Sequence, residues 1–553
     1  MVLTAGIDDS VSIRTPWARE LLLLATLGVL AACGARNDGD LSGVADSDGP
    51  LIPVVPAGSP FHGVHGIRFD ANDNLYAASV IGQSIYTVDI DTGTVNTLIE
   101  PPDGMGDDIA FAADGTMVWT AIENGILYAR SPEGSIRRVL EGYRGVNAVS
   151  FAPDGRTLYL SLVFYGDALY EVDLYGDAPP RLISEGHGGL NAFEVASDGM
   201  IYGPLVFGGR VVRIDPATGA SETVSDEFVS PGALKLESDE TALVLDDGAE
   251  IKRVVLATGE TSVLARLPAG ADNLAIDSSG RVFVSLSETN AIVEIDAQSG
   301  AVSYVVEPAP LNSPAGFAID TSSAGDVLYV GDLFGGIKVV DAASGAIEHV
   351  AVELFQPTHI AVTPEHVIAV SEVFGTVQRF AKSDFSVLDT WDTFVTPGDV
   401  LVMPDGTIVV AETGAGTLEQ IRSDGTQSVV ASGLRGPRGL AAAGPAAVYV
   451  TESTNGTIRR VELASGVTTQ VAAGLAQPEG LAVEAGGTLL VIEVGARRLT
   501  RVEPTSGTAV PVVESLPIGL ANGPSLYRDV NIGSGGIYLN SDVDNTVYLI
   551  NAR

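Results

Sequence analysis

From about residue 60 onward, short stretches of strand-forming residues are separated by turns rich in glycine and aspartate. In one such stretch, "IVVAETGAGT", a run of β-branched residues ends on the acid Glu412 and then breaks into small residues. Alternation of apolar and polar positions with a period of two predicts strands, and no helical periodicity competes with it. A later turn of the same phrase, as in "DAQSGAV" (296–302), carries a glycine, because these tight connections need a positive φ that costs other residues about 1 kcal/mol.

The phrase of four strands recurs with a period near 40 residues, which is typical of a β-propeller. Its copies begin near His65, Asp107, Asn147, Asn191, Gly232, Asp272, Ala315, Thr358, Gly398, Arg438, Glu479 and Arg528. Propellers usually hold about four to eight blades, so twelve copies divide naturally into two rings. We therefore expect an all-β chain with two tandem six-bladed propellers made of four-stranded antiparallel blades.

A change in the residues before each first strand marks the border between the rings. Most repeats of the second half have a proline there, namely Pro314, Pro357, Pro397, Pro437 and Pro478, whereas the first half has glycine and polar residues, as in "GVNAV". The expected propellers span residues 59–312 and 313–553. The last repeat stops after three strands, and Leu51–Val55 ("LIPVV") is available to supply the fourth, which would join both chain ends in one blade.

The charge balance narrows the range of partners. The chain has 553 residues, with 30 lysines and arginines against 70 aspartates and glutamates, and a formal net charge of −40. Long-range attraction to nucleic acid or to an anionic membrane surface is therefore not expected, and no basic cluster offers a phosphate-binding face. Cations should bind more easily than anions. A single cysteine excludes an intramolecular disulfide.

The N-terminus has the pattern of an export signal. Arg14 and Arg19 precede an apolar run, Leu21–Leu30, that is too short to span a bilayer. "LAAC", ending at Cys33, then resembles a bacterial lipobox. The resemblance implies a signal peptide at residues 1–32, a lipid on Cys33, an acidic tether at 33–58, and anchoring by the lipid alone, with the outer membrane, facing the periplasm or the surface, as the expected location. The alternative is an ordinary signal peptide followed by a chance cysteine.

The stretch "PEGLAVEAGGTLLVIE" (478–493) resembles the NHL-repeat and senescence-marker-protein/gluconolactonase superfamily of six-bladed propellers, with virginiamycin B lyase and strictosidine synthase as more distant relatives. In lactonases of this kind a divalent cation (Ca, Mg or Zn) lies at the top of the channel. The resemblance places Asn147 and Asn191 at its ligand positions, with Asp107 and Asp272 as further oxygen donors. The Glu and the Asp of the family motif are replaced by His65 and Gly232.

Other polar residues of the two funnels have a functional and a structural interpretation. His65 and His187 are candidates for a general base in the first propeller, although such histidines also bond turn backbone. In the second propeller the unlike members of the repeat are the candidate ligand contacts. These are His359, Arg438, Glu479 and Arg528.

Carboxylates also end the second strand in most blades of the second propeller. They are Asp332, Glu372, Glu412, Glu452 and Glu493. One interpretation is a collar for a cation, since converging acids would otherwise raise one another's pKa. The other is a structural bond from each carboxylate to the backbone N–H groups of the following turn. Repetition in every blade favours the structural interpretation.

Two functions from different classes follow. The first is a non-catalytic binding module, anchored at the cell envelope, whose partner is a small molecule or an envelope protein. The alternative is a metal-assisted hydrolase or lyase of gluconolactonase or virginiamycin B lyase type with its site in the first propeller. The sequence contains no motif for a Ser-His-Asp nucleophile, a P-loop, a dinucleotide fold or a zinc site.

Overall fold

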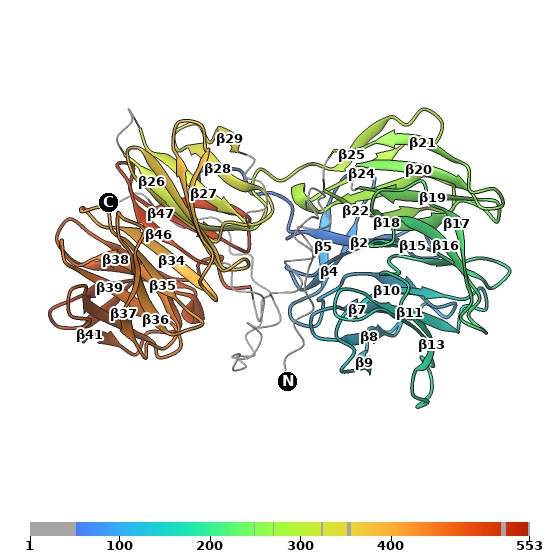
Figure 1. Cartoon of the computed structure of the whole chain (residues 1–553), viewed down its shortest axis with the longest axis horizontal. Coiled ribbons are helices and arrows are strands. Elements are labelled where there is room, and N and C mark those ends of the chain that lie inside the picture. Colours follow the sequence, from blue (N-terminus) through green and yellow to red (C-terminus); the bar gives the residue numbers. More distant parts are fainter. Residues whose placement is uncertain are drawn as a thin grey trace.

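The computed structural model describes residues 51–247, 249–268, 270–321, 325–350, 356–520 and 527–550. The strands in these ranges form twelve four-stranded antiparallel sheets, which confirms the predicted all-β class and blade type (Figure 1). The signal segment, Cys33 and the tether up to residue 50 lie outside the described residues. Within the described ranges, no helix has the length and apolar character needed to cross a membrane.

The first six sheets in chain order, blades 1–6, form one closed ring. The innermost strand of each blade contacts that of the next, and the sixth returns to the first through β22 and β2. The strands are β2 (Val64–Phe69), β3 (Leu75–Ser79), β4 (Ser84–Val88), β5 (Val95–Ile99), β6 (Ile109–Phe111), β7 (Met117–Ala121), β8 (Ile126–Arg130), β9 (Ile136–Leu140), β10 (Val146–Phe151), β11 (Leu158–Leu162), β12 (Ala168–Val172), β13 (Arg181–Glu185), β14 (Glu194–Val195), β15 (Ile201–Leu205), β16 (Arg210–Ile214), β17 (Ser221–Ser225), β18 (Pro231–Leu236), β19 (Thr241–Asp246), β20 (Glu250–Val255), β21 (Thr261–Arg266), β22 (Ala271–Ile276), β23 (Val282–Leu286), β24 (Ala291–Ile295) and β25 (Val302–Val306), with the 3-10 turn η1 (Ser287–Thr289).

The other six sheets, blades 7–12, form a second closed ring, in which β26 contacts both β30 and β46. Its strands are β26 (Pro314–Asp320), β27 (Val327–Asp332), β28 (Gly336–Asp341), β29 (Ile347–Val350), β30 (His359–Val362), β31 (His366–Ser371), β32 (Thr376–Ala381), β33 (Val387–Trp391), β34 (Pro397–Val402), β35 (Ile408–Glu412), β36 (Thr417–Ile421), β37 (Gln427–Ser432), β38 (Pro437–Ala442), β39 (Ala447–Glu452), β40 (Thr457–Glu462), β41 (Thr468–Ala473), β42 (Pro478–Val483), β43 (Leu489–Glu493), β44 (Arg498–Glu503), β45 (Thr508–Val513), β46 (Val530–Ile532), β47 (Ile537–Ser541), β48 (Thr546–Ile550) and β1 (Leu51–Pro53), with the 3-10 turn η2 (Val494–Ala496).

Blade 12 is assembled from both ends of the described chain. β1 runs antiparallel to β48, with Leu51 opposite Ile550, and so supplies the outer strand that the last repeat lacks. Val54 continues the ladder, because its N–H donates to the carbonyl of Val547 at 2.8 Å. Val55 is then only 1% exposed and packs in an apolar cluster with Phe317 of blade 7.

Each blade buries both faces against its neighbours, as expected for sheets that are apolar on two sides. Between blades 1 and 2, for example, the fully buried Trp119 stacks on Tyr128, with ring centroids 5.2 Å apart, and shares a cluster with Ile85 and Ile109. Similar clusters follow between later blades. The rings are therefore held by packing between blades rather than by a single central core.

The two rings meet through turns and loops. Ile81, after β3, packs against Leu333, after β27, in a small apolar cluster. The Asn545 amide, between β47 and β48, donates to the Phe61 carbonyl at 2.7 Å and accepts from the N–H of Ser313 at 3.1 Å. In Figure 1 the rings accordingly lie side by side, joined by the chain that leaves β25.

Candidate functional site

The start of each innermost strand lies beside the end of the second strand in the same blade. Pro437 pairs with Glu452 and Pro478 with Glu493. A bulge follows in both blades before regular pairing resumes, and it leaves room for polar side chains at the end of the central channel. We call the end where the innermost strands begin the channel mouth.

Four of the strand-end acids bond backbone N–H groups at this mouth. Glu412 accepts from Val395 at 3.0 Å and from Thr396 at 2.8 Å, and Glu493 accepts from Ala476 at 2.7 Å. Glu452 and Asp332 do the same with the N–H groups of Arg435 (2.8 Å) and Asn312 (2.8 and 2.9 Å). These bonds match the structural interpretation of the acids with one correction. The donors belong to the loop before the innermost strand, not to the turn that follows the acid.

Two further acids bond such a loop and were not among the five found in the sequence. Asp542 of blade 12 accepts from the N–H groups of Gly519 (2.8 Å) and Leu520 (3.0 Å), and Asp246 of blade 5 accepts from Ser230 (3.0 Å). Asp542 was not predicted because it lies 49 residues after Glu493 (542−493=49), outside the period near 40 that the other acids follow. Asp246 pairs directly with Pro231, as the other strand-end acids pair with the start of the innermost strand. The short hairpin that follows Asp246 hid this correspondence in the sequence.

Glu372 departs from this pattern. Its Oε2 accepts a hydrogen bond from Arg438 Nη1 at 3.0 Å, although Arg438 belongs to blade 10 and Glu372 to blade 8. Its other oxygen, Oε1, is buried and has no hydrogen-bond partner in the part of the chain that the structure describes. Burial raises the pKa of the Glu372 carboxyl, and the Arg438 guanidinium opposes that rise.

Arg528 also lies at the channel mouth and contacts two carboxylates. Its backbone N–H donates to Glu479 Oε2 at 3.0 Å, and its Nη1 lies 3.8 Å from the same oxygen. Its Nη2 donates to Asp542, while its Nε is buried without a partner among the described ranges. We call Glu372, Arg438, Glu479, Arg528 and Asp542 the mouth cluster. All five side chains are at most 7% exposed.

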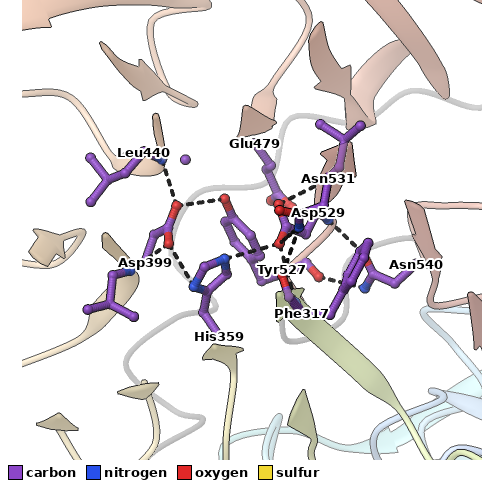
Figure 2. A network of polar contacts seen from close by, with 12 residues as sticks. Phe317, His359, Asp399, Leu440, Glu479, Tyr527, Asp529, Asn531 and Asn540 are labelled. Carbon is purple, nitrogen blue, oxygen red and sulfur yellow. Dashed lines mark hydrogen bonds and ion pairs between the residues drawn. The ribbon is translucent and has the colours of Figure 1, made fainter. Parts of the chain in front are cut away.

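His359, which the sequence placed in the same funnel, lies beside Tyr527 and between two carboxylates (Figure 2). Its Nδ1 is 2.7 Å from Asp399 Oδ1 and its Nε2 is 3.1 Å from Asp529 Oδ2. Burial alone would lower the pKa of His359, but the two carboxylates outweigh it and raise that pKa to about 10. The imidazole is therefore a buried cation at neutral pH. We call His359, Asp399 and Asp529 the histidine clamp.

The clamp also ties blades together through the backbone. Asp529 Oδ2 accepts from the N–H of Phe317 at 3.2 Å, which joins blade 12 to blade 7, and Asp399 Oδ2 accepts from Leu440 at 2.6 Å. Tyr527 donates its hydroxyl to Asp399 Oδ2 at 3.1 Å and meets the His359 ring edge-on at 4.8 Å. Asp399 and Asp529 were not predicted, because each stands one residue after the repeat position, Gly398 or Arg528, that marks the start of its blade in the sequence.

Gly316 provides the space for this clamp. A Cβ at Gly316 would lie 2.2 Å from Cδ2 of His359 and 2.9 Å from Cδ1 of Tyr527, well inside van der Waals contact. The equivalent position carries Asp399 and Asp529 in blades 9 and 12. Gly439 and Gly480 hold the same position in blades 10 and 11, so blade 7 is one of three blades that leave room at the level where blades 8, 9 and 12 contribute charged side chains.

In the first propeller the predicted residues lie at or near the starts of innermost strands, except His187, which lies in the loop after β13. Asn191 Oδ1 accepts from the N–H of Ala192 at 3.1 Å, and the carbonyl of Asp107 accepts from Gly66 at 2.8 Å. His65 is 3% exposed. His187 is half-buried, its Nε2 lies 2.7 Å from Ser184 Oγ in the preceding strand, and burial lowers its pKa. Among these side chains, Asn191 therefore bonds backbone and His187 bonds a side-chain hydroxyl.

The contacts of the predicted ligand residues give little support for a divalent-cation site. Asn147 Oδ1 is buried without a partner in the described ranges, but the neighbouring carboxylate, Asp108, uses both oxygens for the N–H groups of Ile109 and Val149. Asp272 stands one residue before Asn273, whose Oδ1 accepts from the next N–H. Across the described residues no group of three or more His, Cys, Asp or Glu side chains is placed to hold a metal. The cation therefore stays a prediction from the resemblance.

No protein-family model and no curated protein matches the chain. Among solved structures, a GH74 enzyme from Niastella koreensis matches at 14% identity and a TM-score of 0.45, covering 90% of this chain and 93% of its own. The extracellular domain of a putative one-component system from B. thetaiotaomicron matches at 11% identity and a TM-score of 0.33, covering 91% of this chain and 79% of its own. Virginiamycin B lyase from Staphylococcus aureus matches at 16% identity and a TM-score of 0.27, covering 58% of this chain and 95% of its own. Similarities of this size bear on the β-propeller fold alone.

Proposed function

We propose that this protein is a non-catalytic binding module whose ligand is held at the channel mouth of the second propeller. One observation carries the proposal. The mouth cluster breaks the repeat, is buried, and keeps Glu372 Oε1 and Arg528 Nε without a partner in the described part of the chain. Buried polar atoms are nearly always bonded in native proteins, so two such atoms at one mouth favour a ligand that bonds them.

The charges of the cluster define the chemistry of that ligand. Glu372 Oε1 accepts a hydrogen bond and Arg528 Nε donates one. Within the mouth cluster two guanidinium groups face three carboxyl groups, so the cluster is close to neutral and disfavours a ligand of high net charge. A small molecule with a donor and an acceptor, such as a zwitterion, fits these requirements. The histidine clamp occupies part of the channel, so the ligand should bind at the mouth and not deeper in the channel.

The test is a binding screen on the purified protein. Amino acids, dipeptides and betaines would be compared by thermal shift, and the best of them measured by calorimetry. Glu372→Gln keeps the shape of the side chain and removes its charge, so it should weaken binding by about tenfold or more. Glu412→Gln is the matched control, because Glu412 holds the same strand position one blade later but bonds only its own loop. Equal effects of the two substitutions, or binding by neither protein nor variant, would contradict the proposal.

The location of the protein and its relatives are proposed from the resemblances of its sequence. We propose that the protein is exported and anchored by a lipid on Cys33, at the outer membrane, and that it is related to the NHL-repeat and gluconolactonase-like propellers. The small ligand or an envelope protein is then its partner. Cys33→Ser should abolish incorporation of labelled palmitate and release the protein from the membrane fraction.

The hydrolase or lyase alternative is less favoured. It requires a cation site in the first propeller, where Asp108 is already used by backbone N–H groups and Gly232 replaces an acid of the family motif.

A further inference from the structure

Three charged side chains of the first propeller converge inside its central channel. They are Arg68 on β2, Glu194 on β14 and Lys235 on β18. Arg68 Nη1 and Lys235 Nζ both contact one oxygen, Glu194 Oε1, the lysine at 3.0 Å. Blades 1 and 4 lie opposite each other in a ring of six, so the contact between Arg68 and Glu194 spans the channel.

The donors of this group outnumber its acceptors. An arginine carries five N–H donors and a lysine three, yet Glu194 is the only hydrogen-bonding or ion-pairing partner of Arg68 and of Lys235 within the described ranges. The Lys235 side chain is 6% exposed and that of Arg68 is 25% exposed. The remaining donors of Arg68 thus have no acceptor among the described residues, and none of its nitrogens is a fully buried atom, so they face solvent in the channel.

The charge of the group is also unbalanced. Burial opposes ionisation of Glu194, but Arg68 and Lys235 outweigh it and lower the pKa of that carboxyl to about 2. One full negative charge therefore faces two positive ones. A further acid, Asp108, interacts electrostatically with Lys235 and Arg68, but both its oxygens are engaged by backbone N–H groups, and burial outweighs the two cations and raises the pKa of its carboxyl. The channel thus concentrates positive charge in a protein whose net charge is −40.

We propose that the channel of the first propeller binds a small oxyanion, a carboxylate or phosphate group, between Arg68 and Lys235. A planar guanidinium presents two parallel N–H donors to such a group, and the ammonium adds a point charge. The site is independent of the proposed function, since it lies in the other ring and takes an anion rather than a ligand without net charge. The proposal departs from the expectation that so acidic a chain offers no phosphate-binding face.

The test uses calorimetry on the full chain at low ionic strength, with inorganic phosphate and acetate as separate probes. Lys235→Met keeps a long side chain and removes the charge, so it should weaken binding by about tenfold or more. Lys252→Met is the control, because Lys252 lies in the same blade but pairs with Asp246 outside the channel, and it should bind as the parent protein does. Glu194→Gln should have the opposite effect and strengthen binding, because it removes the anion that competes for both cations.

The opposite signs of Lys235→Met and Glu194→Gln keep the proposal testable if one variant fails to fold. Saturable binding of one oxyanion per chain, weakened in Lys235→Met or strengthened in Glu194→Gln, supports the site. A structural ion pair alone predicts no saturable heat for either probe in the parent protein or in Glu194→Gln, and that result would overturn it. Binding that is unchanged in a folded Lys235→Met would do so too.

Discussion

The Nε2 atom of His359 lies 3.1 Å from Oδ2 of Asp529, although the two residues are 170 positions apart in the chain. His359 begins β30 of blade 8, and Asp529 precedes β46 of blade 12, so the contact reaches across blade 7. Asp399 of blade 9 holds the other ring nitrogen. The histidine clamp therefore joins three blades of the second propeller at its centre, in addition to the packing between neighbours.

Removing the imidazole should destabilise the second propeller strongly. In His359→Leu two buried carboxylates lose their cation, and breaking a buried pair in this way costs about 3–5 kcal/mol. Urea denaturation followed by Trp391 fluorescence would measure the free energy of unfolding. His366→Leu, in the next strand of the same blade and partly exposed, is the control and should change stability by only about 0.5 kcal/mol. A small effect of His359→Leu would show that the clamp contributes little.

The clamp also predicts a loss of stability in alkali. The pKa of His359 is about 10 in the folded chain, against an ordinary value of 6.5. A raised pKa means that the folded state binds the proton more tightly, so the contribution is complete below pH 6.5 and is lost as the pH rises through about 10. Melting temperatures measured from pH 6 to 10.5 should fall more steeply in the parent protein than in His359→Leu. Parallel curves would mean that the imidazole is not a buried cation.

The sequence revealed the architecture because the signals for it are local. Strand alternation, turn glycines such as Gly300, and the period near 40 residues all act within a blade, and they suffice for two rings of six. Which side chains meet in the channels depends, in contrast, on the register between neighbouring strands. In blade 9 a bulge between Pro397 and Asp399 shifts which side chain meets its neighbours, and in blade 12 Asp529 stands directly before β46, one residue after Arg528.

Contacts across a ring are harder to predict. Arg68 and Glu194 are 126 residues apart, and neither stands at a position of the repeat that the sequence pattern singled out. Their pairing follows from closure of the ring, which no local pattern encodes. A charged residue in an otherwise apolar innermost strand, as in "ALKL" with Lys235, is the signal that would have drawn attention to them.

Gly316 is expected to tolerate no side chain. In Gly316→Ala the new Cβ would lie 2.2 Å from Cδ2 of His359, and overpacking of this kind costs about 1–3 kcal/mol. The cost should appear as a lower urea midpoint for the second propeller. Gly486→Ala is the control, since no atom lies within 4 Å of the Cβ it would add. A neutral Gly316→Ala would mean that His359 and Tyr527 can move aside without loss.

We expect the segment that follows β1 to be needed for closure of the second ring. Val55 follows β1, is 1% exposed and contacts the cluster around Phe317, so Val55→Asp places a carboxylate in an apolar core. We expect a loss of about 3 kcal/mol or more, since the charge has no partner there. Ile52→Asp is the control, because Ile52 lies in the same strand but is 45% exposed. Hydrogen exchange measured by mass spectrometry should show faster exchange in β48 for Val55→Asp only, because β48 pairs directly with β1. Equal protection of β48 in both variants would mean that the ring stays closed without this segment, and that the two ends of the chain need not meet in one blade.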